Sequence, residues 1–478
     1  CSVLLAGVLI VTGCSKAPTQ LDKLKQKFAE MEAAALAEEY SGIVNSDGKT
    51  PGLFPVAATG VDTLPIIEAA QKLLASLTKQ QLERTTFPIN DSEWRKWSNV
   101  DNGIYDRQGV SLKEMDQQQR NALFALSRNI MKTDQTLKEL NDDPDSYDEQ
   151  LYFLTIMGTP SSTEPWGWQF DGHHLIINFF VLGDQVVMTP IFMGGEPIQT
   201  TSGKYKGNVI LQEEQNAGLA LAQSLDIEQR VLALSSPKKG GTDMVASANM
   251  DNLVLDYTGI PASELSATQR RNLRELIALY IANMREPYAK IKMTDVEKHL
   301  DQTYFTWIGD MSDDGVFYYR IHGPTVLIEF DHQAPVGVPG SRNREQATRN
   351  HIHTIVRTPN GNDYGKDLCL RICLGCNFHH RWFLGELLQQ IAIWRVRSRS
   401  GHASPRSCFY RVAGSAYRAD NLSRSGQDQA TYGFGHGWHL LGLCTDYNGS
   451  VDCVAIIPAQ HRSARNGSCE QNAGLSAV

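Results

Sequence analysis

Hydrophobic positions recur at helical spacing in the first part of the chain. Residues 21–40 predict one helix, and the Gly- and Pro-containing stretch of residues 41–63 ends it. Later segments repeat one N-terminal signature, in which a short oxygen-bearing residue stands three positions before Gln. The pairs are Thr78 and Gln81, Asp116 and Gln119, Asp226 and Gln229, and Ser266 and Gln269. Each pair predicts a helix start, and we interpret these helices as scaffold.

Extended segments alternate with these helices. Residues 151–197 are rich in aromatic and β-branched side chains and contain a turn-like stretch, residues 182–185, which together predict a long hairpin. Apolar residues occupy both parities after His174, so both faces of this hairpin should be covered. Further strands are expected near residues 302–308, 316–322, 324–331 and 350–358. The predicted fold class is α+β, with one mostly antiparallel sheet and helices packed on it.

Side chains of metal-ligating types converge on two of the expected strands. Successive side chains of a strand alternate between its faces, so His351, His353 and Arg357 share one face, and Glu329 and Asp331 share a face of the preceding strand. If the two strands are antiparallel neighbours, two histidines face two carboxylates. A His-x-His pair with a carboxylate is a ligand set for zinc or iron. His351, His353 and Glu329 are therefore candidate ligands of a divalent metal.

The alternative is a polar cleft without metal, in which both histidines bond to the backbone or to Asp331. His174 is adjacent to His173, so the two side chains point to opposite faces and at most one can join the cluster. His174 shares parity with Trp166, Trp168 and Phe170 and is expected beside an aromatic wall, whose tryptophans we interpret as core. We consider His174, Asp331 and Arg357 candidate catalytic residues.

Charged residues in the expected strands need partners. Arg320 and Arg357 alternate into strands where an unpaired charge is expensive to bury. Glu329 and Asp331 are their expected structural partners, and an anionic ligand is the alternative. The glycines of residues 192–197, FMGGEP, are predicted to form a turn.

Three stretches, in this order, resemble one known family. They are PWGWQFDGHHLIINF, FYYRIHGPTVLIEFD and NHIHTIVRTPNGNDYGKDL, within residues 62–368. Together they resemble the bacterial family known as domain of unknown function 3500, which implies one exported domain and no established activity. Two features depart from the family pattern: residues 332–349 form a longer link between the last two stretches, and His322 stands where the resemblance predicts Gln.

The first residues are typical of an export signal. Residues 2–13 are an apolar run too short to span a bilayer, and Val11-Thr12-Gly13-Cys14 resembles the bacterial lipobox, whose Cys is lipidated. The chain lacks an initiator Met and a basic segment before this run, so we interpret residues 1–14 as a truncated lipoprotein signal peptide. A buried helix that happens to end in Cys is the alternative. Residues 15–61 are then an N-terminal helix and linker, and the protein is expected in the bacterial cell envelope, anchored through Cys14 on the periplasmic side.

Charge and cysteine content set the last 110 residues apart. Residues 369–478 hold 11 Arg, no Lys and 6 acidic residues, a formal charge of +5 in a chain of net charge −8. Seven of the nine cysteines lie there. We interpret this tail as a segment read out of frame or disordered. A divergent extension, and a zinc site at Cys369, Cys373, Cys376 and His379, are the alternatives.

Two classes of function remain open. The net charge of −8 argues against a nucleic-acid partner, and patterns for nucleotide binding, serine hydrolases and zincins are missing from the sequence. One hypothesis is a metal-dependent hydrolase or oxidoreductase that acts on a small polar substrate. The other is a lipid-anchored binding or accessory protein, in which the same residues form a structural polar network.

Overall fold

The chain forms two compact units, Cys1–Arg371 and Ile372–Val478. The computed structural model describes residues 18–128, 150–202, 206–336 and 345–368, together with the backbone of five strands between residues 408 and 455. In the second unit, β14 (Cys408–Val412) pairs with β15 (Ser415–Ala419). A separate antiparallel sheet contains β16 (Asp428–Phe434), β17 (Trp438–Tyr447) and β18 (Ser450–Ala455). The candidate lipidation site Cys14 and the cluster from Cys369 to His379 lie outside the described residues.

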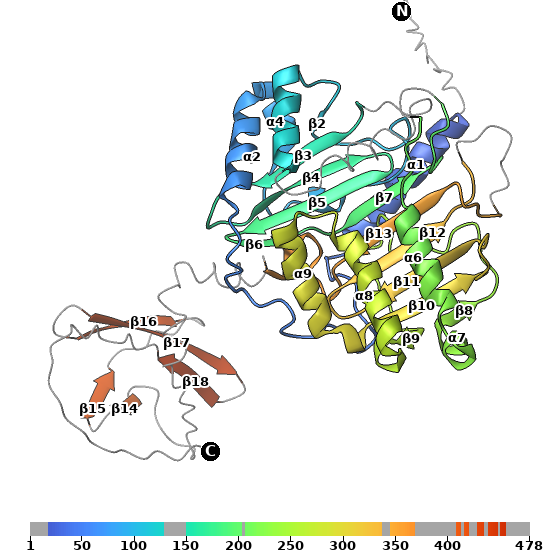
Figure 1. Cartoon of the computed structure of the whole chain (residues 1–478). Helices are drawn as coiled ribbons and strands as arrows, with labels where there is room; N and C mark the ends of the chain where they lie inside the picture. Colours follow the sequence, from blue (N-terminus) through green and yellow to red (C-terminus); the bar gives the residue numbers. More distant parts are fainter. Residues whose placement is uncertain are drawn as a thin grey trace, which may run out of the picture. The chain divides into compact units, whose positions relative to one another are not determined.

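One large sheet organises the first unit (Figure 1). Its strands run in the order β1-β3-β4-β5-β7-β13-β12-β11-β10-β8, and β2, β6 and β9 pair beside this path. In the first half of the chain they are β1 (Thr86–Phe87), β2 (Val110–Ser111), β3 (Phe153–Gly158), β4 (Trp166–Gly172), β5 (Leu175–Leu182), β6 (Gln185–Val187) and β7 (Ile191–Gly195). In the second half they are β8 (Leu234–Ser236), β9 (Ile260–Pro261), β10 (Tyr304–Gly309), β11 (Phe317–His322), β12 (Leu327–His332) and β13 (Ile352–Arg357). Apart from β1 with β3 and β8 with β10, neighbours are antiparallel, so the predicted α+β class is confirmed.

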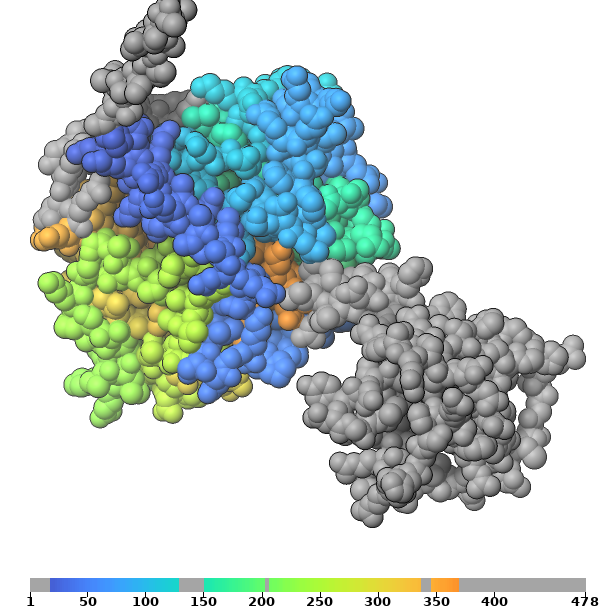
Figure 2. Space-filling model, turned by 180° about the vertical axis from the view of Figure 1, so that it is seen from behind, coloured from blue at the N-terminus to red at the C-terminus, as the bar shows by residue number. Residues whose placement is uncertain are grey.

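Most of the helices pack on one face of this sheet, and the first helix lies on the other (Figure 1 and Figure 2). The α-helices are α1 (Gln20–Ala37), α2 (Leu64–Ser76), α3 (Lys79–Thr85), α4 (Gln117–Arg128), α6 (Gln212–Gln223), α7 (Ile227–Ala233), α8 (Ala267–Ile281) and α9 (Glu286–Lys298). Short 3-10 helices are η1 (Ser92–Arg95), η2 (Ala262–Glu264), η3 (Leu300–Gln302) and η4 (Asp363–Gly365). Buried residues of α2, α4, α6 and α8 join one hydrophobic core with strand residues such as Trp168, Ile191 and Val356. In the described ranges, no helix combines the length and the apolar character that crossing a membrane requires.

Loops and the N-terminal segment cover the opposite face. Figure 2 shows α1, in deep blue, and the residues that follow it crossing this side of the molecule. The backbone of Val44 forms a parallel bridge with Val254, and Asn360 donates its N–H to the carbonyl oxygen of Ile43. Trp97 packs against Phe192 of β7 with ring centroids 6.5 Å apart. Both faces of the central strands are therefore buried, as the hairpin sequence predicted.

All four predicted capping signatures are present at helix starts. In each, the short side chain accepts the N–H of Gln and the Gln side chain accepts the N–H of the cap residue. The four glutamines also pair in space. Gln119 Nε2 donates to Gln81 Oε1 and Gln269 Nε2 donates to Gln229 Oε1, both at 2.8 Å. Each pair thereby joins the starts of two successive α-helices, across 38 residues in the first pair and 40 in the second.

These paired glutamines belong to an internal two-fold repeat. Val110 pairs with Leu154 in the first half as Ile260 pairs with Phe305 in the second. From each edge of the sheet to its centre, the strands follow the same pattern: β1-β3-β4-β5-β7 from one edge and β8-β10-β11-β12-β13 from the other. In both series the first pair of strands is parallel. The equivalent strands β7 and β13 meet at the centre, where Ile191 lies opposite Val356. A local two-fold axis therefore passes through the middle of the sheet. The elements α2, α3, β1, β2, α4, β3, β4, β5 and β7 correspond in order to α6, α7, β8, β9, α8, β10, β11, β12 and β13.

Candidate metal centre

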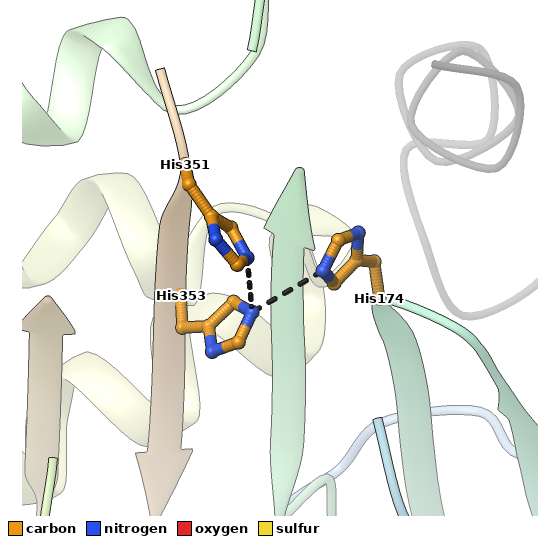
Figure 3. Close-up of side chains that lie close together, drawn as sticks. All are labelled: His174, His351 and His353. Carbon is orange, nitrogen blue, oxygen red and sulfur yellow. Dashed lines mark hydrogen bonds between the residues drawn. The ribbon is translucent and has the colours of Figure 1, made fainter. Parts of the chain in front are cut away.

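Three histidines converge on the loop-covered face of the sheet (Figure 3). His353 lies on β13, and His351 lies immediately before this strand. His174 lies in the two-residue turn between β4 and β5, where its φ of 62° lies in the left-handed region. β7 runs between β5 and β13, and its Gly194 pairs with His353. In the second half of the repeat, Thr325 stands where His174 stands in the first, because both turns follow equivalent strands.

The distances between the ring nitrogens match a metal site. His353 Nε2 lies 3.0 Å from His351 Nε2 and 3.2 Å from His174 Nε2, and the three ligand atoms all lie within 4.8 Å of one another. Zn–N bonds of about 2.0–2.1 Å at tetrahedral angles would separate two ligand nitrogens by roughly 3.3 Å. The ring planes are inclined by 88°, 64° and 59° to one another, so the nitrogens meet from three directions.

Hydrogen bonds among the three imidazole rings cannot satisfy all of their facing nitrogen atoms. His351 Nδ1 lies 2.8 Å from the carbonyl oxygen of Ala334, which only accepts, so Nδ1 carries the proton and Nε2 of the neutral ring presents a lone pair. His353 Nε2 can direct a single N–H at the two facing nitrogens, which leaves that proton shared between His351 and His174. A cation bound between the rings would instead satisfy all three lone pairs.

A second layer of contacts fixes the orientation of His351. Its Nδ1–H donates to Ala334, and the Glu196 carboxylate lies 3.6 Å from the same nitrogen. Glu196 in turn accepts the N–H of Val336 at 2.9 Å, which holds the segment that carries the Ala334 carbonyl. Metal-binding histidines commonly donate their second ring nitrogen to a carbonyl or carboxylate in this way.

Gly194 makes room for two of the rings. A Cβ atom at this position would lie 2.8 Å from His353 Cδ2 and 2.9 Å from His174 Cδ2, closer than side chains tolerate. The predicted turn at FMGGEP is therefore wrong for this residue, since β7 extends through Gly195. The glycine serves close packing of the imidazoles across a strand.

Burial keeps the imidazoles neutral. It lowers the pKa of His353 and of His174 well below the usual histidine range, and it also lowers the pKa of His351. Neutral imidazole is the form that binds metals. His351 is buried, whereas His353 retains partial exposure.

The predicted carboxylates are engaged elsewhere. Glu329 accepts the N–H groups of Val245 and Ala246 at 3.0 and 2.8 Å, and burial raises its pKa. Asp331 does lie directly opposite His353 across β12 and β13. Its Oδ1 is nevertheless 2.8 Å from Lys239 Nζ, and its Oδ2 accepts the backbone N–H groups of Asp243 and Met244. The structure thus brings His174, His351 and His353 together and places Glu329 in a separate network.

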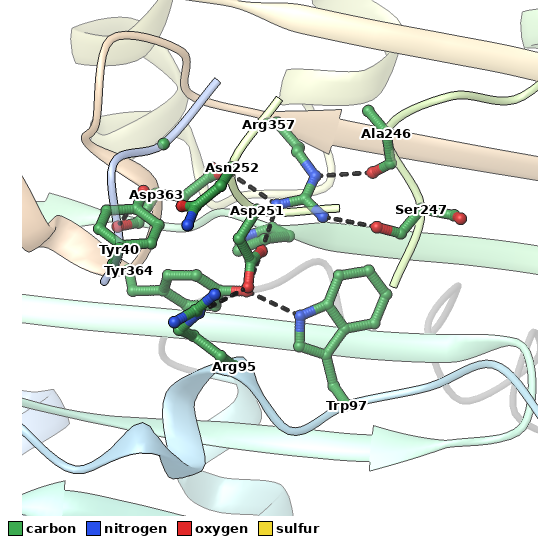
Figure 4. A network of polar contacts seen from close by, with 12 residues as sticks. Tyr40, Arg95, Trp97, Ala246, Ser247, Asp251, Asn252, Arg357, Asp363 and Tyr364 are labelled. Carbon is green, nitrogen blue, oxygen red and sulfur yellow. Dashed lines mark hydrogen bonds and ion pairs between the residues drawn. The ribbon is translucent and has the colours of Figure 1, made fainter. Parts of the chain in front are cut away.

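Arg357 is the centre of a third network (Figure 4). It is fully buried and donates to the carbonyl oxygens of Ala246 and Ser247 at 2.7 and 2.8 Å. Its Nη1 lies 2.8 Å from Asp251 and 3.0 Å from Asp363. The prediction that Arg357 pairs with Glu329 or Asp331 is therefore wrong. Asp251 and Asp363, which lie in segments that fold over the strand, pair with it instead.

The expected aromatic wall does not adjoin His174. Trp166 and Trp168 belong to the core on the helix side, which confirms their interpretation as core residues. The register pairs Phe170 with Ile177 of that core, whereas His174 lies on the other side with His353. The alternation of side chains along β4 does not continue to His174, because His174 lies in the turn after β4, where its positive φ changes the direction of its side chain.

Sequence reasoning also missed Glu196, Gly194 and Ala334. The Gly194-Gly195 pair preceding Glu196 was a possible signal, since adjacent glycines between apolar residues can indicate close packing in a strand. Ala334 offers a backbone carbonyl, for which the sequence carries no signal.

Fold and site together define an α+β protein with a three-histidine group that could hold a metal ion. A model of the family described as "Protein of unknown function (DUF3500)" matches residues 59–366, and the chain belongs to this family. Neither a curated protein nor a solved structure matches the chain.

Proposed function

We propose that this protein is a metal-dependent enzyme whose metal is bound by the Nε2 atoms of His174, His351 and His353. The convergence of these three nitrogens carries the proposal. The Nδ1 contact of His351 with Ala334 supports it, because that contact leaves Nε2 of the neutral ring free for a metal.

Three neutral imidazoles suit a catalytic centre better than a purely structural one. Structural zinc sites use four protein ligands, whereas catalytic sites use three and keep a position open for water or substrate. Imidazole ligands suit zinc, copper, iron and nickel, and zinc bound in this way lowers the pKa of its water to about 7. We infer hydrolysis of a small polar substrate as the first candidate reaction, and oxygen chemistry if the metal is iron.

The second candidate is a binding or accessory protein that holds the metal without turnover. The positions and partners of the nearby carboxylates favour this second candidate. Asp331, opposite His353, is held by Lys239 and backbone N–H groups, and Glu196 lies behind His351 on its Nδ1 side. Neither carboxylate is placed as a general base on the side where the three Nε2 atoms meet.

We further propose that the protein acts in the bacterial cell envelope, anchored by lipid at Cys14. The apolar residues 2–13 and the sequence Val11-Thr12-Gly13-Cys14 support this location.

Isothermal titration calorimetry of metal-free protein with Zn²⁺ tests the metal site. We expect one ion per chain for wild type and loss of binding for His174→Ala, His351→Ala and His353→Ala. His173→Gln is the matched control, because His173 stacks on His174 with centroids 3.8 Å apart but is not a member of the group. Gly194→Ala should weaken binding through the two short contacts to the rings.

Turnover separates the two candidates. Zinc-loaded and iron-loaded wild type are assayed against panels of esters, amides and phosphate esters and for oxygen consumption, with His353→Ala as the blank. Activity that depends on His353 supports the enzyme. Metal binding without activity toward any panel favours the binding protein, and equal zinc binding by wild type and His353→Ala contradicts both.

A further inference from the structure

A pocket lies on the helix side of the sheet, on the face opposite the histidines. It encloses about 290 Å³ between α8, α9, β6 and the ends of β7 and β13. Ile191 and Val356 line it, and their side chains point away from the face that carries His353. The side chains of Met284 and Tyr288 line the pocket on the side of the helices. Its size is near the lower end of about 300–1,000 Å³ found for small-molecule sites.

One cation enters this mostly apolar pocket without a counter-ion. Lys292 Nζ donates to the carbonyl oxygen of Thr325 at 2.7 Å and to Thr358 Oγ1 at 2.9 Å. Both partners are neutral, and within the described part of the chain no carboxylate lies within 4.0 Å of this ammonium group. Burial lowers the pKa of Lys292 to about 8, although the more distant carboxylates of Asp295 and Asp363 act in the opposite direction.

The donors that remain unused lie side by side. An ammonium group has three N–H donors, and Lys292 uses two. Thr358 Oγ1 accepts from Lys292 and from Thr189 Oγ1, the latter at 2.8 Å, so its two lone pairs are occupied and its own proton is left to donate.

We propose that this pocket binds a small carboxylate with an apolar body, whose two oxygens accept from Lys292 Nζ and Thr358 Oγ1. The two donor atoms are 2.9 Å apart and suit the paired oxygens of one carboxylate. The apolar side chains of Met284, Tyr288 and Ile191 then contact the body of the ligand. The site is separate from the metal centre and does not depend on it.

Calorimetry with octanoate and octan-1-ol, which differ in the charged head, tests the proposal on the full chain. Wild type should bind octanoate more tightly than octanol. Lys292→Met should lose at least about tenfold in octanoate affinity, the effect of one charge-assisted hydrogen bond, and keep its octanol affinity. Lys298→Met is the matched control, because Lys298 also lines the pocket but is exposed and lies 3.2 Å from Asp295.

A blocking variant keeps the test decisive if Lys292→Met does not fold. Met284→Trp should fill the pocket and abolish binding of both probes while Zn²⁺ titration stays as in wild type. The proposal is overturned if wild type binds no octanoate at millimolar concentration, if octanol binds as tightly, or if either variant binds octanoate as wild type does.

Discussion

Replacing Arg357 by Met should destabilise the first unit without touching the histidine cluster. The variant removes four hydrogen bonds from a fully buried guanidinium and leaves Asp363 and two backbone carbonyls without that partner. Breaking a buried ion pair on one side costs about 3–5 kcal/mol. Asp251 keeps Arg95 at 3.0 Å, which limits the charge left uncompensated. We therefore expect a loss of about 3 kcal/mol in the free energy of unfolding.

Urea unfolding followed by tryptophan fluorescence measures this loss. The midpoint should fall while the slope m stays constant, because the same surface is exposed on unfolding. Adding Asp363→Asn to Arg357→Met should recover part of the stability, because it removes the orphaned charge. Arg84→Met is the control: its ion pair with Glu114 is 2.7 Å long but largely exposed, so its loss should cost no more than about 1 kcal/mol. A cost below about 1 kcal/mol for Arg357→Met, or loss of zinc binding in its folded fraction, would refute the structural assignment.

Four further outcomes are expected. Ile352→Ala should cost roughly 2–4 kcal/mol in thermal or urea unfolding through a core cavity and leave zinc binding intact, whereas His353→Ala should do the reverse. Burial, and then Arg320, lower the pKa of His322 to about 3, so stability should fall as pH drops from about 6.5 toward 3; in urea titrations His322→Gln should remove up to ~1.4 kcal/mol per pH unit of that slope. Cys14→Ser should move the protein from the membrane to the soluble fraction, and an unchanged distribution would show that Cys14 is not the anchor. A chain ending at Leu368 should unfold in the same cooperative transition, and aggregation or a large drop in Tm would show that the tail contributes structure.

Local chemistry made much of the fold predictable. The four capping signatures each need only residues three positions apart, and all four occur at helix starts. The β5–β6 turn follows equally local rules, and Leu182 pairs with Gln185 as its sequence suggested. The internal repeat was only hinted at by the recurring signature. It became evident from pairing registers, such as Val110 with Leu154 and Ile260 with Phe305.

The candidate site was predictable only where it rests on strand parity. His351 and His353 are two residues apart, so alternation placed them together. The third histidine, His174, is 179 residues away from His353, and its direction depends on a turn with positive φ. Arg357 was assigned strand neighbours as partners, but Asp251 approaches from a loop 106 residues away. Contacts of this kind depend on how loops fold over a sheet, for which a single sequence gives no periodic signal.

The most direct test of the metal centre is an anomalous difference map from a crystal of the zinc-loaded protein. We expect one peak about 2.0–2.1 Å from the Nε2 atoms of His174, His351 and His353, with a fourth position open to solvent. A zinc peak bound to other residues, or no peak between these three rings, would contradict this expectation.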